Sequence, residues 1–167
     1  SWGNEIVLGF TLGYVDTAAI GHKRDRGRPF ETMQARSMDG GETWQVDRMP
    51  CKSPGDKALS ANEHQIPALQ IVEELEAPGT FISPDGSVDY THPDLALMCA
   101  RTGLGAGAVS WYYLSIDRCR TWRGPYRWTD FNLPGISART DYLVSGPKEC
   151  TFFLTAVKPN GREGRVF

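Results

Sequence analysis

The sequence predicts an all-β fold built from several short antiparallel strands. The chain has 167 residues, enough for one domain with a real core. It contains 11 Pro and 18 Gly, so turns are frequent, which suits many short strands better than long helices. Runs rich in β-branched and aromatic residues alternate with these turns. One eight-residue turn pattern also occurs twice, which indicates repeated sheets.

The first copy of this pattern spans residues 37–44 and reads Ser-x-Asp-x-Gly-x-Thr-Trp. Its fixed positions are Ser37, Asp39, Gly41, Thr43 and Trp44. An Asp carboxylate accepts hydrogen bonds from backbone N–H groups a little further along the chain, and glycine tolerates a positive φ. The segment therefore predicts a β-hairpin turn, which the large indole anchors against the sheet if it is buried.

The second copy follows at an offset of 78 residues (115 − 37). Ser115, Asp117, Thr121 and Trp122 keep their places, and Cys119 replaces the glycine. Four matched positions at fixed spacing predict repeated supersecondary units. We expect the two turns, with their indoles, to lie in equivalent surroundings.

These two turns resemble the Asp-box, or BNR, repeats of the sialidase (neuraminidase) superfamily. The resemblance implies a six-bladed β-propeller with Asp-boxes on turns between the third and outermost strands of several blades. In that family the boxes lie away from the active site. Asp39 and Asp117 are therefore expected to be structural rather than catalytic.

The first unit is expected over residues 1–49. A strand is predicted at Glu5–Phe10, and strands at Phe30–Arg36 and Trp44–Val46 flank the first turn. The charged segment 21–29 between them has loop composition. A solvated hairpin tip is favoured there, with an anionic-ligand loop as the alternative.

The pattern loosens between residues 50 and 89, where an insertion is expected. Pro67–Glu76 predicts one short helix, because Leu69, Val72 and Leu75 have helical spacing and Pro67 suits the first helical position. The alternative is that Ile66–Leu69 begins an inner propeller strand.

Two further units follow in the predicted order. Blade two is expected over about residues 50–130, and blade three begins at about residue 131 and runs to residue 167. Their predicted strands are Asp94–Arg101, Ala108–Leu114, Gly124–Trp128, Arg139–Val144, Thr151–Val157 and the beginning of one at Arg165–Phe167. The whole chain is thus expected to be one partial propeller domain. It would hold about two and a half blades of four-stranded antiparallel sheets, and the remaining blades or a second chain would close the ring.

The resemblance also implies an active site on the propeller axis. An arginine triad there binds the substrate carboxylate, a Tyr paired with Glu is the nucleophile, and an Asp is the acid/base. Guanidinium groups suit the triad because they bind carboxylates bidentately and stay charged. One family arginine stands in a Phe-Arg-Ile-Pro motif. The nearest segment here, His64-Gln65-Ile66-Pro67, has Gln in its place.

Arg139 is the main candidate for carboxylate binding, because it stands at the start of a predicted innermost strand. Asp141 and Tyr142 beside it are the accompanying catalytic candidates. Strand alternation sends Arg139 and Asp141 to one face and Tyr142 to the other, so all three reach one ligand only if the strand is bulged. The alternative is a surface ion pair followed by a strand aromatic.

His92 and Asp94 bracket a proline at a strand entrance. Asp94 is a candidate acid/base and His92 a candidate ligand for a sugar hydroxyl. A capping contact is the alternative for the pair. Arg101, at the end of the same predicted strand, is a further substrate-binding candidate.

The expected function is a sialidase-like glycoside hydrolase acting on terminal sialic acid, or a related acidic sugar, of glycoconjugates. One alternative is a non-catalytic Asp-box propeller that binds glycan or protein. Another is a hydrolase of a different sugar.

Composition argues against other partners. A net charge of −2 gives no support to nucleic-acid binding, and no apolar run is long enough to cross a membrane. His22, His64 and His92 are too far apart for a metal motif, so no metal or cofactor is implied.

The four cysteines, Cys51, Cys99, Cys119 and Cys150, contain no C-x-x-C pair. Free thiols are favoured, with one or two disulfides as the alternative. The chain begins without Met or a recognisable signal peptide, which suggests a start inside a longer reading frame. Secretion and a cytoplasmic location are both left open.

Overall fold

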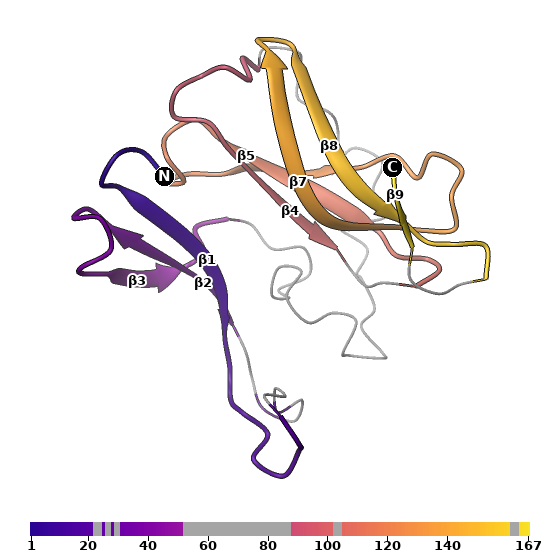
Figure 1. The fold of residues 1–167 in the computed structure, drawn as a ribbon, viewed down its shortest axis with the longest axis horizontal. Helices are drawn as coiled ribbons and strands as arrows, with labels where there is room; N and C mark the ends of the chain where they lie inside the picture. The colour runs from indigo at the N-terminus through magenta and orange to yellow at the C-terminus, as the bar shows by residue number, and fades with distance from the viewer. Residues whose placement is uncertain (22–24, 26–27, 29–30, 52–87, 102–104, 161–163) are drawn as a thin grey trace. The chain divides into compact units, whose positions relative to one another are not determined.

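The computed structural model describes residues 1–21, 25, 28, 31–51, 88–101, 105–160 and 164–167. Over these residues the fold is all-β with no helix, which confirms the predicted class. Nine strands among them form three antiparallel three-stranded sheets, each in simple sequential order (Figure 1). The helix expected at 67–76, the alternative inner strand at 66–69 and Gln65 lie outside the described residues.

The chain divides into two compact units. Ser1–Pro50 contains the first sheet, and Cys51–Phe167 contains the second and third sheets.

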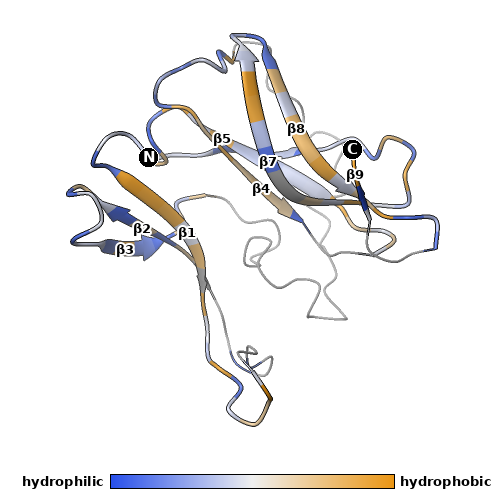
Figure 2. Ribbon diagram, viewed as in Figure 1, coloured by the Kyte–Doolittle hydropathy of each residue, from blue (hydrophilic) through white to orange (hydrophobic). Residues whose placement is uncertain are grey.

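The first sheet consists of β1 (Ile6–Leu12), β2 (Glu31–Ser37) and β3 (Gln45–Arg48). Its register runs from the pair Ile6/Ser37 at one end of β1 to the pair Leu12/Glu31 at the other. Figure 2 shows an apolar β1 beside the more polar β2 and β3. The buried Glu5 carboxylate pairs with the guanidinium of Arg36 on β2, which gives this buried charge the partner that it needs.

The second sheet consists of β4 (Ala96–Arg101), β5 (Ser110–Ser115) and β6 (Arg123–Arg127). All six residues of the central strand β5 are buried. The sequence of β5 is Ser-Trp-Tyr-Tyr-Leu-Ser. Its four central residues form a continuous run of large, mainly apolar side chains and do not alternate with polar ones, as expected for a strand covered on both faces.

The third sheet consists of β7 (Ile136–Gly146), β8 (Glu149–Ala156) and β9 (Arg165–Val166). Between the pairs Ser137/Thr155 and Asp141/Phe153, β7 has residues 138–140 where β8 has only residue 154. This is a β-bulge, and it contains the backbone of Arg139. Because β7 begins at Ile136, Arg139 lies inside the strand and not at its start, contrary to the sequence-based prediction.

The second and third sheets pack on each other through a shared apolar core. Buried side chains of β7 and β8 form its centre, and aromatic side chains from both sheets surround it. The rings of Tyr112 and Trp128 have centroids 4.5 Å apart, and those of Trp128 and Phe152 are 4.7 Å apart in an edge-to-face arrangement. Such contacts fix the two sheets relative to each other within this unit.

We expected four strands in each sheet. Among the described residues, each sheet has three. All four cysteines are free thiols, and Cys119 is buried.

Candidate functional site

Residues 37–44, referred to below as the first box turn, connect β2 to β3 through side-chain hydrogen bonds. The buried Ser37 hydroxyl donates to Asp39 Oδ1 at 2.7 Å and accepts from the Gly41 N–H at 2.8 Å. Asp39 Oδ1 accepts from the Thr43 N–H at 2.9 Å, and Oδ2 accepts from the Thr43 hydroxyl at 2.5 Å. Both carboxylate oxygens are therefore used to close the turn.

Residues 115–122, the second box turn, connect β5 to β6 with the same bonds. The Ser115 hydroxyl donates to Asp117 Oδ1 at 2.8 Å and accepts from the Cys119 N–H at 2.9 Å. Asp117 accepts from the Thr121 N–H at 2.9 Å and from its hydroxyl at 2.5 Å. These four bonds are the same in both turns, and the second turn adds one from the Arg120 N–H to Asp117 Oδ1 at 3.0 Å.

The backbone is equivalent as well. Gly40 and Gly41 have φ of 79° and 101°, and Arg118 and Cys119 have φ of 57° and 63° at the matching positions. The second turn therefore keeps two left-handed residues without glycine, a conformation that side chains normally disfavour.

These contacts lower the pKa of both aspartates. The Thr43 hydroxyl and N–H and the Ser37 hydroxyl hold the pKa of Asp39 well below its ordinary value. Burial opposes this effect at Asp117, yet the bonds from Thr121 and Ser115 still lower its pKa. A carboxylate that stays ionised as an acceptor suits a structural role and not that of a general acid near neutral pH.

The two indoles differ, contrary to the expected equivalence. Trp44 is 39% exposed and donates from Nε1 to the Gly41 carbonyl at 2.9 Å. Trp122 is half-buried, and its Nε1 has no acceptor among the described residues. A Cβ at Gly41 would lie 3.5 Å from the Trp44 ring, and Cys119 carries a side chain at the matching position. The added Cβ alone would be in ordinary contact with the ring, and the two turns also differ at 38/116, 40/118 and 42/120.

Each box turn is also bonded to a tight turn that precedes the first strand of its sheet. The Gly40 N–H donates to the Asn4 carbonyl at 2.9 Å, and the Arg118 N–H donates to the Asp94 carbonyl at 3.1 Å. Asn4 stands two residues before β1, and Asp94 stands two residues before β4. The repeat therefore includes this leading turn.

The leading turn of the second sheet contains His92 and Asp94. His92 Nδ1 accepts from the Asp94 N–H at 3.1 Å, and the His92 carbonyl accepts from the Leu95 N–H at 3.0 Å. The Asp94 carboxylate accepts from Arg118 Nε at 2.6 Å. Both predicted site residues thus contribute to the turn, and Asp94 joins it to the second box turn.

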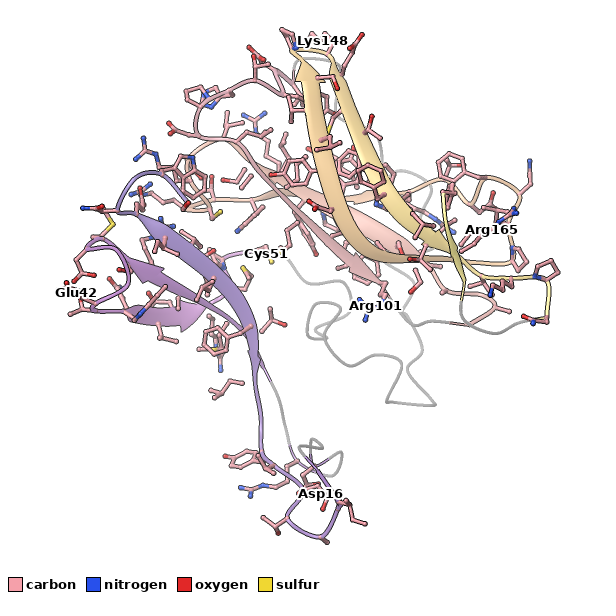
Figure 3. All side chains as sticks on the ribbon, viewed as in Figure 1. Asp16, Glu42, Cys51, Arg101, Lys148 and Arg165 are labelled. Carbon is pink, nitrogen blue, oxygen red and sulfur yellow. The ribbon has the colours of Figure 1, made fainter. Side chains whose placement is uncertain are left out.

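Arg101 lies at the other end of β4, as Figure 3 shows. The pair Ala96/Ser115 marks the box end of the sheet and the pair Arg101/Ser110 the opposite end. From there Arg101 Nη1 donates to the Ala138 carbonyl, at 3.5 Å, in the bulge of β7. The structure therefore brings Arg101 to the backbone that carries Arg139. The side chain of Arg139 lies outside the described part of the protein.

Asp141 and Tyr142 follow the bulge and differ in burial. Asp141 is exposed, and its Oδ1 accepts from the Tyr142 N–H at 2.8 Å. Tyr142 is half-buried, beside the main chain of Leu97 on β4. Burial raises the pKa of this phenol, so its nucleophilic phenolate form is disfavoured.

The predicted site residues of β4 and its leading turn therefore fall into two groups. His92 and Asp94 lie at the box end of β4, and Arg101 lies at the opposite end, beside the bulge. With about 3.3 Å per strand residue, seven positions separate Asp94 from Arg101 by roughly 20 Å. One small ligand cannot contact both groups.

The sequence-based reasoning missed Asn4, Arg118 and Ser110. Asn4 and Asp94 each stand two residues before the first strand of a sheet. That shared position was the sequence signal from which the leading turns could have been recognised as part of the repeat. It was hidden because the leading turns are at unequal distances from the box turns along the chain.

No protein-family model, curated protein or solved structure matches this chain. Within the described ranges, no group of three or more His, Cys, Asp or Glu side chains is arranged to hold a metal ion. The same ranges contain no helix of the length and apolarity needed to span a membrane.

Proposed function

We propose that this chain is part of a sialidase-like glycoside hydrolase built on an Asp-box β-propeller. The observation that carries the proposal is the pair of box turns, which close successive antiparallel sheets with the same hydrogen bonds. In this proposal each three-stranded sheet belongs to one blade. Further blades, from the same or another chain, complete the ring.

The substrate is a terminal sialic acid or a related acidic sugar. Its carboxylate is bound at the sheet end opposite the box turns, where Arg101 reaches the bulge that contains Arg139. This choice follows the resemblance, in which the boxes lie away from the active site. Two guanidinium groups would offer the sugar carboxylate charged, directional donors.

The remaining candidates take other roles in this proposal. Asp94 and His92 belong to the box end, so they are structural. Burial raises the pKa of the Tyr142 phenol and disfavours its phenolate, so in this proposal the nucleophile is a different residue. Hydrolysis then requires a nucleophile and an acid/base beyond the arginines named here.

A second candidate function is glycan binding without cleavage. It is favoured by the ion pair of Asp94 with Arg118 and by the burial of Tyr142, because the first occupies a predicted acid/base and the second disfavours a tyrosine phenolate. The same arginines would bind the acidic sugar, but no bond would be broken.

The test is incubation of the full-length protein with a fluorogenic sialoside. We expect fluorophore release that is lost in Arg139→Ala and retained in Asp94→Asn. Release that is unchanged in Arg139→Ala would remove the proposed binding role of this residue. Binding of the sialoside without release would establish the second function instead.

A further inference from the structure

Ser110 joins the second sheet to the third through a single hydroxyl group. Ser110 is the first residue of β5 and is only 1% exposed. Its Oγ donates to the Ile136 carbonyl at 2.6 Å and accepts from the Ala138 N–H at 2.9 Å. One side chain thus satisfies two backbone groups of β7 in a place that water does not reach.

Main-chain bonds lead up to this contact. The Gly107 N–H donates to the Pro134 carbonyl at 2.8 Å, and the Ile136 N–H donates to the Ala108 carbonyl at 2.9 Å. The segment before β5 therefore runs beside the start of β7, and the Ser110 hydroxyl supplies the next bonds along this line. At this point the Ser110 side chain makes the bonds to β7 that the main chain of a neighbouring strand would otherwise make.

The bonds from Ser110 end where the bulge begins. Ala138 is the first of the three residues that face the single residue 154 of β8. Its N–H is bound by Ser110, and its carbonyl accepts from Arg101. The N–H and the carbonyl of Ala138 are therefore both bonded to residues of the second sheet. Residues 139 and 140, the two extra residues of the bulge, follow directly.

We propose that Ser110 is a positioning residue for carboxylate recognition, because it fixes the bulge that carries Arg139. This inference rests on the proposed function, in which Arg139 binds the substrate carboxylate. Ser110 itself does not contact the sugar. Without its hydroxyl, two buried backbone groups lose their partner, and β7 is free to change its register against β8.

The test compares Ser110→Ala with three other variants. Ser110→Thr keeps the hydroxyl, and Ser110→Cys keeps the side-chain size with only a weak donor. Ser145→Ala changes an exposed serine of β7, the strand to which Ser110 is bonded, and is the matched control. The Cys variant keeps the test valid if the Ala variant does not fold.

Two quantities are measured for each variant in the full-length protein. The first is the hydrogen-exchange rate of the Ala138 amide. The second is the affinity for a methyl sialoside relative to its uncharged carboxyl methyl ester. In Ser110→Ala and Ser110→Cys we expect exchange at Ala138 to rise at least about tenfold and the preference for the acid to fall about tenfold. Ser110→Thr and Ser145→Ala should change neither quantity appreciably.

Unchanged exchange at Ala138 in the Ala and Cys variants would show that Ser110 does not hold the bulge. Faster exchange with an unchanged preference for the acid would show that the bulge does not position Arg139. A wild-type protein that does not prefer the acid would overturn the proposed function together with the role of Ser110. That last outcome is distinct, because the failure appears in the wild type itself.

Discussion

Asp94 holds Arg118 through both its main chain and its side chain: the Asp94 carbonyl accepts from the Arg118 N–H, and its carboxylate accepts from Arg118 Nε. Arg118 is one of the two left-handed residues of the second box turn. The ion pair therefore fixes that turn against the leading turn of β4. In the first sheet the corresponding contact between box turn and leading turn is the main-chain bond from the Gly40 N–H to the Asn4 carbonyl.

Removal of this ion pair should cost little stability. The two side chains are 40% and 31% exposed, so solvent screens their attraction, and exposed pairs contribute about 0.2–1 kcal/mol. A double-mutant cycle with Asp94→Ala and Arg118→Ala, followed by urea denaturation, should give a coupling free energy in that range. A coupling energy above about 2 kcal/mol would mean that the pair is more important than its exposure indicates.

The serines of the two box turns should be equally important. Ser37→Ala and Ser115→Ala each remove one acceptor, from the N–H of half-buried Gly41 and of buried Cys119 respectively. We expect each variant to lose about 1–3 kcal/mol of unfolding free energy. Urea denaturation measures this loss, and Ser145→Ala, an exposed serine, should stay within about 0.5 kcal/mol of the wild type. A large effect in only one of the two turns would contradict their equivalence.

Gly41 should be sensitive to substitution because of its backbone and not because of crowding. Its φ is 101°, and the nearest atom to an added Cβ is 3.5 Å away. Gly41→Ala should therefore destabilise the protein by about 1–2 kcal/mol in thermal or urea unfolding. Gly9→Ala is the matched control, since Gly9 has no positive φ and its added Cβ meets only the flexible end of Met49. Equal losses in the two variants would point to packing instead.

The box aspartates should make stability depend on acid pH. Their pKa values are lowered in the folded protein, so their contribution is complete above the ordinary value of 3.8 and is lost as the pH falls from there toward the folded-state pKa. Below about pH 5, unfolding free energy should fall less steeply in Asp39→Asn/Asp117→Asn than in the wild type. Asp47→Asn, an exposed carboxylate of β3, serves as the control. Parallel curves for the double variant and the wild type would argue against this origin.

The strands and box turns could be predicted because their determinants are local. Turn chemistry at Asp39 and Asp117 acts within a few residues, and the β-branched and aromatic runs on either side mark the strands. Equivalence of Trp44 and Trp122 was the part of this prediction that failed. The turns differ at four positions, 38/116, 40/118, 41/119 and 42/120, and the matched Ser, Asp, Thr and Trp residues do not fix where the indole lies.

The candidate site was less predictable, because its geometry depends on contacts between sheets. The roles of Asp94 and Ser110 depend on Arg118 and on β7, which are distant in sequence. The bulge in β7 was recognised from the sequence only as a condition for Arg139, Asp141 and Tyr142 to meet. Its presence follows from pairing with β8 and from the bonds to β5, and no local signal encodes either.

The most direct test of the account is the affinity of the full-length protein for a methyl sialoside compared with the carboxyl methyl ester of the same sugar, measured by calorimetry. Loss of charge-assisted hydrogen bonds to the carboxylate should weaken binding of the ester at least about tenfold. This preference should disappear in Arg139→Ala and persist in Asp94→Asn. Equal affinities of the wild-type protein for acid and ester would contradict recognition of an acidic sugar by these arginines.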